Sequence, residues 1–333
     1  MSFKNLEKNK IKRPIFSRRS FLFGAAGVTT LAASSSYLLG SLSIDTNNIQ
    51  VEEVFIGVKN LPGALRNFRI ALIADIHYGV FVKGDLIEEV VEAVNKLKPD
   101  LIILLGDYIG LPDSLLGKAF AAKLTKDSDF REFKHYTTSR SAAPPELIMA
   151  IFEKLSRILR KLHSPRQTLA ILGNHDGWLD TRAGLKKFEE AGIKVMGNET
   201  LSMRVNQAEL KIVAVEDFWT GIPRIDYLTA AKKDQEVRIL LAHNPDYVTE
   251  IIGEGNNKKF DLALSGHTHG GQIVIPLLGA LGGYNLIYNR FKSGLHRTKT
   301  DHNLQVYVSR GIGVIEIPYR INCRPEISLI TLN

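Results

Sequence analysis

Two short apolar runs, FRIALIA at residues 68–74 and LIILL at residues 101–105, are each followed closely by an aspartate. Each run has the length and composition of a buried β-strand. Between them, residues 85–97 gather apolar side chains on one face of a helix, namely Leu86, Ile87, Val90, Val91, Val94 and Leu97. A strand, a helix and a second strand in this order predict a right-handed crossover that makes the two strands parallel.

The ends of this helix carry signals of their own. Asp85 and Glu88 have the spacing of a capping box at the start of the helix, and Pro99 is expected to end it. A second amphipathic helix is expected over residues 146–162, followed by a strand over residues 168–172. These signals predict a repeated unit of helix and strand in the first half of the chain.

The second half contains mainly strand signals. Strands are expected at residues 210–215, 237–242, 262–265, 272–275, 305–309 and 327–332, without helices between them. The chain has 333 residues, 44% of them hydrophobic, so it can bury a substantial core. The class of fold is therefore expected to be α/β, with a second half that is mixed and richer in strands.

Polar side chains that bind metals follow the apolar runs in a fixed order along the chain. Seven candidate ligands are Asp75 and His77 in ADIHYG, Asp107 in LLGDY, Asn174 in LGNHD, His243 in LAHNPD, and His267 and His269 in SGHTHGGQ. His175 lies beside Asn174. Sites in open α/β sheets form where strands end, because the loops converge there. The set is large enough for two adjacent metals, which is a device for hydrolysing phosphoesters.

The series D-x-H, G-D, G-N-H-D, H and G-H-x-H resembles the calcineurin-like metallophosphoesterase superfamily, over residues 68–332. The tail from Ser309-Arg310-Gly311 to Pro318, together with Asn322-Cys323-Arg324-Pro325-Glu326, is similar to one branch of twin-arginine-exported bacterial phosphodiesterases, which shares GHTHGGQ. This resemblance implies a four-layer α/β/β/α sandwich, with two packed sheets and helices outside. Periodicity alone predicts only α/β.

The resemblance also implies a role for each residue. Asp75, His77 and His269 would hold the first metal, whereas Asn174, His243 and His267 would hold the second. Asp107 would bridge both metals, since a carboxylate has two acceptor oxygens. A mixed nitrogen and oxygen site suits Mn, Fe, Zn or Ni. A hydroxide that bridges the metals would attack phosphorus, and His175 would assist the leaving oxygen without binding metal. For Asp176, orienting His175 and capping the local turn remain equal alternatives.

The positive charge of the chain is concentrated at its start. Residues 1–43 hold seven basic residues and one acidic residue, so +6 of the net charge of +8 lies there and +2 remains for residues 44–333. This distribution argues against a nucleic-acid-binding surface, and no nucleic acid is expected as a partner. The single cysteine, Cys323, excludes an intrachain disulfide and is expected to be a small buried residue.

The leader over residues 1–43 resembles a twin-arginine export signal. Ser17-Arg18-Arg19-Ser20-Phe21-Leu22 follows a basic stretch and precedes residues 20–44, which carry no charge. The alternative is an uncleaved membrane anchor, because 25 uncharged residues can span a bilayer. Either alternative places a single domain, residues 44–333, in the periplasm or cell envelope, with the export machinery and the membrane as partners. Cleavage of the leader stays open.

Two long segments lie beside the metal motifs. A polar and basic insertion covers residues 112–143, where the family has a short acidic continuation after Asp107. An apolar, glycine-rich segment, PLLGALGGYNLIYN, covers residues 276–289. Loops of this length near a site often shape the substrate, although either could be an ordinary surface excursion.

Three alternatives to an exported phosphodiesterase remain open at this point. The substrate could be lipid-linked, as for relatives that cleave the pyrophosphate of UDP-2,3-diacylglucosamine; an exported domain fits that reaction poorly. The chain could be a non-catalytic metal-binding scaffold, but such proteins tend to lose ligands, and none is lost here. It could also be a wall- or membrane-binding module with incidental catalysis, in which case His175→Ala would change no phenotype.

Overall fold

Two six-stranded sheets form the framework of the protein. The computed structural model describes residues 44–112, 114, 118, 143–179, 181–225, 232–281, 284–298 and 304–333, which belong to the unit Ser43–Asn333. The predicted leader and most of the predicted insertion lie outside the described residues. Among the described residues, no helix combines the length and the apolar character that crossing a membrane requires.

The first sheet contains the strands on either side of the predicted crossover. Its order is β1 (Gln50–Ile56), β16 (Glu326–Leu332), β2 (Arg69–Ile73), β4 (Leu101–Leu104), β6 (Thr168–Ala170) and β7 (Ile193–Val195). The pairs β2–β4, β4–β6 and β6–β7 are parallel, and β16 runs antiparallel to β2. The predicted parallel pair is therefore confirmed.

The second sheet comes almost entirely from the second half of the chain. Its order is β14 (Gly294–Arg297), β15 (Gln305–Val308), β11 (Leu262–Ser265), β10 (Glu236–Leu241), β9 (Ala208–Ala214) and β8 (Glu199–Val205). The pairs β9–β10, β10–β11 and β11–β15 are parallel, whereas β8 and β14 are antiparallel edge strands. The sheet is thus mixed, as predicted.

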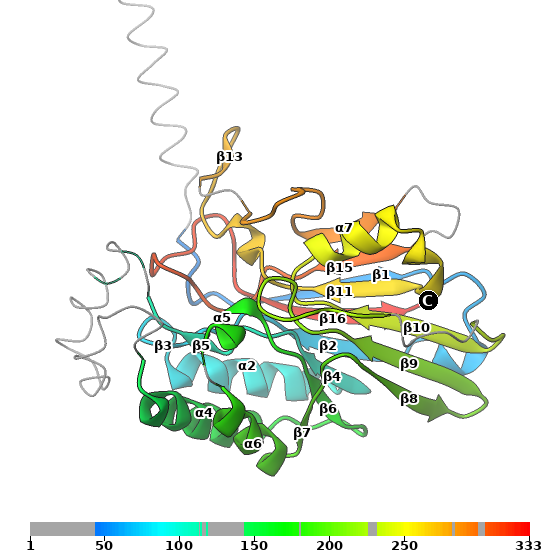
Figure 1. Cartoon of the computed structure of the whole chain (residues 1–333), viewed down its shortest axis with the longest axis horizontal. Coiled ribbons are helices and arrows are strands. Elements are labelled where there is room, and N and C mark those ends of the chain that lie inside the picture. The colour runs from blue at the N-terminus through cyan, green and yellow to red at the C-terminus, as the bar shows by residue number, and fades with distance from the viewer. Residues whose placement is uncertain are drawn as a thin grey trace, which may run out of the picture. The chain divides into compact units, whose positions relative to one another are not determined.

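Helices cover the outer faces of both sheets (Figure 1). The covering helices are α2 (Gly84–Leu97), α4 (Pro145–Leu159), α6 (Arg182–Glu190) and α7 (Asp246–Gly253). The short helix α5 (Asn174–Gly177) lies at the end of the strands, after β6, and single 3₁₀ turns occur at Gly63–Leu65, Asn256–Lys259 and His269–Gly271. Two short pairs complete the fold, β3 (Tyr78–Gly79) with β5 (Ile109–Gly110) and β12 (Val274–Ile275) with β13 (Gly279–Ala280).

The alternation of side chains along the strands produces the layers. On β2, Ile70 and Leu72 enter a buried cluster that joins the two sheets, whereas Ala71 and Ile73 enter a cluster with α2 and α4. A third cluster packs the outer face of the second sheet against α7, through Val248 among others. The order of layers is helix, sheet, sheet, helix, which is the architecture that the resemblance implied.

The prediction that no helices separate the later strands is wrong. The helix α7 and a 3₁₀ turn connect β10 to β11, which is how these two strands come to be parallel neighbours. Only Tyr247, Val248 and Ile251 supply its buried apolar face. Eight residues are too few for the apolar spacing to repeat, so periodicity could not reveal this helix.

Several boundaries also differ from the prediction. The helix α2 begins at Gly84, so Asp85 lies within its first turn, Lys83 is the N-cap, and the expected capping box does not form. The helix α4 ends at Leu159 rather than at residue 162. The strand expected over residues 272–275 is limited to Val274–Ile275 and belongs to a separate hairpin with β13. Local signals place elements well and their ends less well.

Candidate metal centre

The predicted ligands follow five parallel strands at the ends where the chain leaves the sheets. They are Asp75 and His77 after β2, Asp107 after β4, Asn174 after β6, His243 after β10, and His267 and His269 after β11. Because neighbouring strands are parallel, their carboxyl ends lie side by side, and the turns beyond them converge. All seven side chains are buried in one cluster, and His175 lies at its border.

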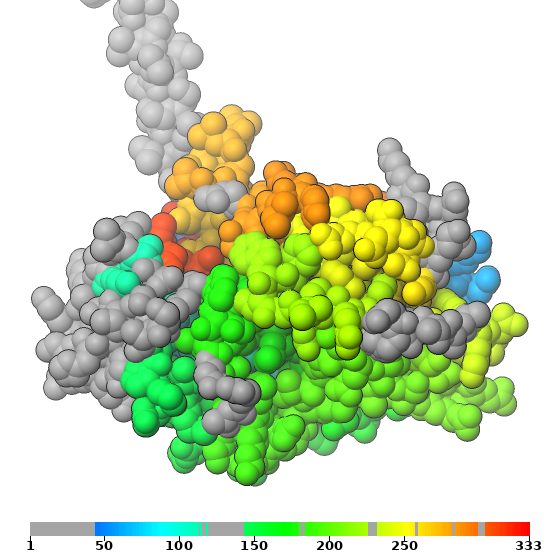
Figure 2. All heavy atoms as spheres, in the orientation of Figure 1, coloured from blue at the N-terminus to red at the C-terminus, as the bar shows by residue number. Residues whose placement is uncertain are grey.

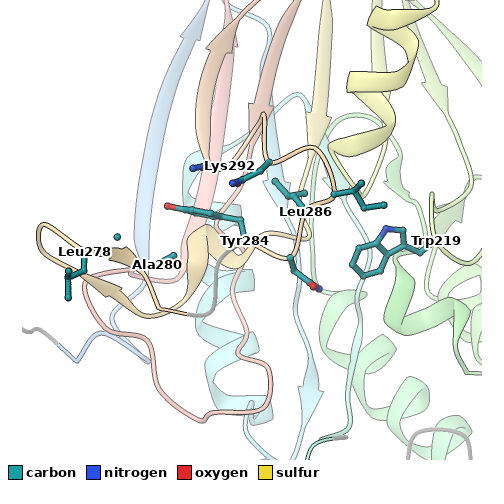
Figure 3. A pocket seen from close by; sticks show the side chains of 10 residues that line it. Trp219, Leu278, Ala280, Tyr284, Leu286 and Lys292 are labelled. Atoms are coloured by element: carbon teal, nitrogen blue, oxygen red, sulfur yellow. The ribbon is translucent and has the colours of Figure 1, made fainter.

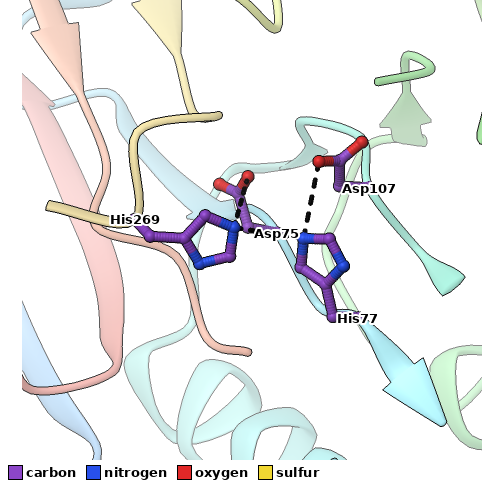
Figure 4. Close-up of side chains that lie close together, drawn as sticks. All are labelled: Asp75, His77, Asp107 and His269. Atoms are coloured by element: carbon purple, nitrogen blue, oxygen red, sulfur yellow. Dashed lines mark hydrogen bonds and ion pairs between the residues drawn. The ribbon is translucent and has the colours of Figure 1, made fainter. Parts of the chain in front are cut away.

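Four side chains form a first group, which could hold one metal ion: Asp75, His77, Asp107 and His269. Their ligand atoms all lie within 4.8 Å of one another. His77 Nε2 is 3.1 Å from His269 Nε2 and 3.4 Å from Asp107 Oδ2, and His269 Nε2 is 3.6 Å from Asp75 Oδ1 (Figure 4). This is the set that the resemblance assigned to the first metal, with Asp107 as the bridge.

A second group shares Asp107 with the first. Asp107, His243 and His267 have ligand atoms within 4.8 Å of one another. The amide oxygen of Asn174 completes this group, since Asn174 Oδ1 lies 2.7 Å from His267 Nδ1 and 3.2 Å from His243 Nε2. Asp107 is the residue common to both groups, as a bridging ligand must be.

The second group brings hydrogen-bond acceptors face to face. His267 Nε2 donates to the carbonyl oxygen of Asn285 at 3.0 Å, so the lone pair of His267 Nδ1 faces Asn174 Oδ1. Burial, reinforced by the charge of His243, lowers the pKa of His267 to about 4, and its ring is neutral near pH 7. Two acceptors at 2.7 Å repel each other unless a cation lies between them. The donor set therefore fits a divalent metal.

His243 is oriented in the same manner from behind the site. Its Nδ1 donates to the carbonyl oxygen of Leu105 at 2.6 Å, which turns Nε2 toward Asp107 Oδ2 at 3.3 Å. Carbonyl oxygens behind a ring are the usual way in which a histidine ligand is held in one tautomer. Leu105, at the end of the first sheet, thus positions His243, which comes from the second sheet.

The Asp107 carboxylate is held from several sides. Its Oδ1 accepts a hydrogen bond from the backbone N–H of His175 at 2.8 Å, and its Oδ2 faces His77 and His243. Burial opposes ionisation, but the charges of His243 and His175 outweigh it and keep the pKa of Asp107 well below its usual range. The carboxylate is therefore ionised, which is the form that binds metal.

The backbone at the ligands is strained. Five of the seven predicted ligands have a positive φ: Asp75 at 50°, His77 at 48°, Asp107 at 57°, His267 at 70° and His269 at 51°. Residues other than glycine adopt this region at a cost of about 1 kcal/mol or more each, and they collect at functional sites. Such a concentration indicates that the surrounding fold fixes these positions for a purpose other than stability.

Two glycines allow the ligands to approach closely. A Cβ atom at Gly173 would lie 2.2 Å from Asp107 Oδ1, and one at Gly266 would lie 2.5 Å from Asp75 Oδ2. Either distance is far below van der Waals contact. The glycines beside the ligand motifs are therefore required by the space that the carboxylates occupy.

Asp176 supports the Asp107 turn. Its carboxylate accepts hydrogen bonds from the backbone N–H groups of Gly173 at 2.9 Å, Asp107 at 2.7 Å and Tyr108 at 2.9 Å. Of the two alternatives for Asp176, these contacts favour the local cap, extended across to the neighbouring loop. The carboxylate joins the turns after β4 and β6 and so fixes the bridging ligand relative to Asn174.

His175 borders the first group without belonging to either. Its ring centroid lies 4.5 Å from that of His77, edge to face, and 5.2 Å from that of Trp178. His175 also lines a cavity of about 550 Å³ together with His267 and His269. Its place at the border between the cluster and a cavity is the place expected of a group that contacts substrate rather than metal.

Sequence reasoning missed Arg320, which is fully buried behind His269. Its guanidinium donates to the carbonyl oxygens of Gly313 at 2.6 Å and Arg310 at 2.7 Å, and Nη2 lies 3.4 Å from His269 Nδ1. Burial, then the charges of His77 and Arg320, hold the pKa of His269 well below its usual range. The available signal was the family-like tail on either side of Arg320, although Arg320 itself lies between the two matched stretches.

Known proteins resemble this chain in sequence. The model of the calcineurin-like phosphoesterase family matches residues 68–271. An uncharacterized metallophosphoesterase of Bacillus subtilis, YkuE, is 29% identical over 95% of this chain and 97% of its own length. The phosphodiesterase YaeI of Escherichia coli is 30% identical over 80% of this chain and 82% of its own length.

A solved structure gives a more distant match. The chain resembles a dimetal phosphatase of Danio rerio with a TM-score of 0.42 and 10% identity, over 74% of this chain and 88% of that one. The family match spans the ligands from Asp75 to His269, and the described residues place those side chains in two groups that share one carboxylate. The chain belongs to the calcineurin-like phosphoesterase family.

Proposed function

We propose that the chain is an exported, binuclear, metal-dependent phosphodiesterase. The observation that carries this proposal is the pair of ligand groups sharing Asp107, in which acceptors such as Asn174 Oδ1 and His267 Nδ1 face each other. When bound, two divalent metals would supply a hydroxide near neutral pH and neutralise the charge that develops on the phosphate oxygens. The mixed nitrogen and oxygen ligands suit Mn, Fe, Zn or Ni.

The protein's own residues would hold the substrate and move the proton. His175 lies between the ligand cluster and the cavity, so its ring can reach the oxygen that leaves phosphorus. It would donate a proton to that oxygen or stabilise its charge. Asp107 would fix the two ligand groups relative to each other. The carboxylate of Asp176 would hold Asp107 by accepting a hydrogen bond from the backbone N–H of Asp107.

The shape of the cavity supports a diester rather than a monoester. Its wall beyond the histidines is mostly apolar, with Trp178, Ile273, Leu281, Tyr284, Ile315 and Ile317. A monoester presents a compact dianion that gains little from such a wall, whereas the second ester group of a diester could bury apolar surface there. The relative YaeI is named a phosphodiesterase, which agrees with this choice.

A lipid-linked pyrophosphate is the second candidate substrate, and the same apolar wall favours it. A non-catalytic scaffold is the third alternative. It is less well supported because His175 and all seven predicted ligands are present and gathered in one place.

Activity can be tested with the full-length protein, stripped of metal and reloaded with Mn. We expect metal-dependent hydrolysis of an aryl phosphodiester, at a higher kcat/KM than for the matching monoester, because only the diester has a second group for the apolar wall. A preference for the monoester would contradict the diester assignment while keeping the enzyme. No hydrolysis of either compound, despite two bound metals, would favour the lipid-linked substrate or the scaffold.

Export is proposed from the sequence of the leader. Arg18 and Arg19 stand in a pattern similar to twin-arginine signals, and these residues lie outside the described ones. Replacing both with lysine keeps the charge, so an ordinary membrane anchor should be unaffected. We expect the lysine variant to stay in the cytoplasm, measured by cell fractionation. Unchanged export would contradict the twin-arginine assignment and leave the anchor.

A further inference from the structure

The hairpin of β12 and β13 carries an exposed apolar tip. We use the term apical leucines for Leu277, Leu278 and Leu281, whose side chains are 95%, 79% and 67% exposed. The hairpin projects from the described surface (Figure 2), with Leu278 at the tip side of the cavity shown in Figure 3. Among the described residues, five of the eleven large exposed hydrophobic side chains lie between Leu277 and Tyr288. Such a concentration marks an interaction surface.

The composition of this segment is unusual for a surface loop. Residues 273–289 contain no charged side chain, although turns exposed to water usually take polar residues. Leu277 also has a φ of 69°, which a leucine adopts at a cost. The tip therefore exposes leucine where a polar residue or glycine would be more stable in water, so its partner is expected to be apolar.

The base of the hairpin lies beside the point where the leader joins the domain. Ile321 pairs with Ile44 on one side and with Ile273 on the other, and Val274 N–H donates to the carbonyl oxygen of Ile321 at 2.9 Å. Ile44 is also the last of the 25 uncharged residues, a number sufficient to span a bilayer. A leader held in a membrane would thus bring the base of the hairpin to the membrane surface.

The hairpin is also a wall of the candidate active site. Ile273 and Leu281 line the cavity of about 550 Å³ that reaches His175 and His269. Leu278 and Ala280 line a neighbouring cavity of about 620 Å³, whose far side is Trp219 (Figure 3). Tyr284 and Asn285 border both cavities. A surface that covered the apical leucines would therefore lie at the entrance to the site.

We propose that the apical leucines insert into the interface of a phospholipid bilayer and dock the domain on it, with its cavities facing the lipid. Transfer of leucine side chains from water to the acyl region is favourable. An exposed apolar loop beside a membrane segment is well placed to enter the bilayer interface. Arg290 and Lys292 follow the uncharged segment, where their charges would meet the phosphate head groups. Docking does not depend on hydrolysis, so it can be tested independently of the proposed activity.

Docking can be tested by fluorescence on the full chain. The native thiol Cys323 is 4% exposed, so a nitrobenzoxadiazole label can be directed to Leu278→Cys. The labelled chain would be assembled, one per nanodisc, in phosphatidylethanolamine and phosphatidylglycerol. We expect the emission to shift to the blue, to rise severalfold in intensity, and to be quenched by lipids with a nitroxide on the acyl chain.

The matched control is the same label at Phe55→Cys. Phe55 is also apolar and is 60% exposed, and it lies near the Ile56 end of β1. That label should remain in water, since a tether alone does not insert it. Adding Leu277→Asp should return the label at Leu278→Cys to water, and aspartate tolerates the left-handed backbone there.

Three results would overturn the proposal. The first is equal emission from the two labelled sites, and the second is quenching that Leu277→Asp does not change. The third is shielding that appears only in vesicles crowded with protein and not in nanodiscs, which would identify a second copy of the chain as the occupant of the hairpin.

Discussion

Asp107→Asn is expected to remove most of the bound metal and to lower diester turnover by more than about a hundredfold. This loss exceeds the one that usually follows when a residue that supports a metal ligand is replaced. Asp107 Oδ2 lies 3.4 Å from His77 Nε2 and 3.3 Å from His243 Nε2, while Oδ1 accepts the N–H of His175. Asparagine has one acceptor oxygen. If the NH₂ group of the asparagine faces the metals, the bridging oxygen is lost. If the NH₂ group faces the backbone N–H of His175 instead, two hydrogen-bond donors are placed against each other.

Metal content after dialysis, followed by hydrolysis at rising Mn concentration, would measure this effect. The matched control is Asp100→Asn, at the opposite end of β4. Asp100 Oδ2 accepts the backbone N–H of Arg69 at 2.8 Å, and an asparagine oxygen can do the same. The control should keep both metals and most of the activity. If Asp107→Asn also kept two metals and near-normal turnover, Asp107 would not be the bridging ligand.

His175→Ala is expected to lower kcat by about a hundredfold or more and to leave the metal content nearly intact, as removal of a general acid does. His175 packs against His77 and Trp178 and lines the cavity, but it belongs to neither ligand group. If its ring protonates the leaving oxygen, the loss should be largest for alkyl esters. Nitrophenyl esters, whose leaving groups need little protonation, should lose less.

The dependence on the leaving group separates chemistry from a packing defect. His175→Asn fills part of the space and should show the same dependence if the proton matters. His163→Ala removes an exposed histidine beyond α4 and should change neither kcat nor metal content. An equal fall in metal content for His175→Ala would show that the ring supports the ligands, and the assigned role would be wrong.

The first half of the fold could be predicted because its signals are local. The run that became β4 is fully apolar, the run that became β2 is apolar after Arg69, and α2 carries its buried side chains, Ile87, Val90, Val91 and Val94, at helical spacing. Edge strands escaped prediction for a physical reason. The strands β1 and β8 have one fully buried residue between them, Ile56, and expose residues such as Glu53, Ser202 and Arg204. They therefore lack the continuous apolar run that marks the central strands.

The candidate site could also be predicted only in part. The ligand types and their order after apolar runs were sufficient to predict which seven side chains gather, and they do gather. Their role as metal ligands stays a prediction. Arg320 could not be predicted, because nothing near it in the sequence indicates that it lies behind His269, which is 51 residues away. The two segments become neighbours through tertiary contacts, such as the pairing of Ile321 with Ile273.

By itself, the sequence determined the class of fold, the family and the set of candidate ligands, since each depends on residue types at fixed local spacing. Tertiary structure alone decided which oxygens and ring nitrogens face one another, and why Gly173 and Gly266 have no room for a side chain. It also decided that the hairpin with the apical leucines has its base beside the leader junction and forms a wall of the candidate active-site cavity. Those facts depend on contacts between residues far apart in the chain, and such contacts form only when the two sheets pack.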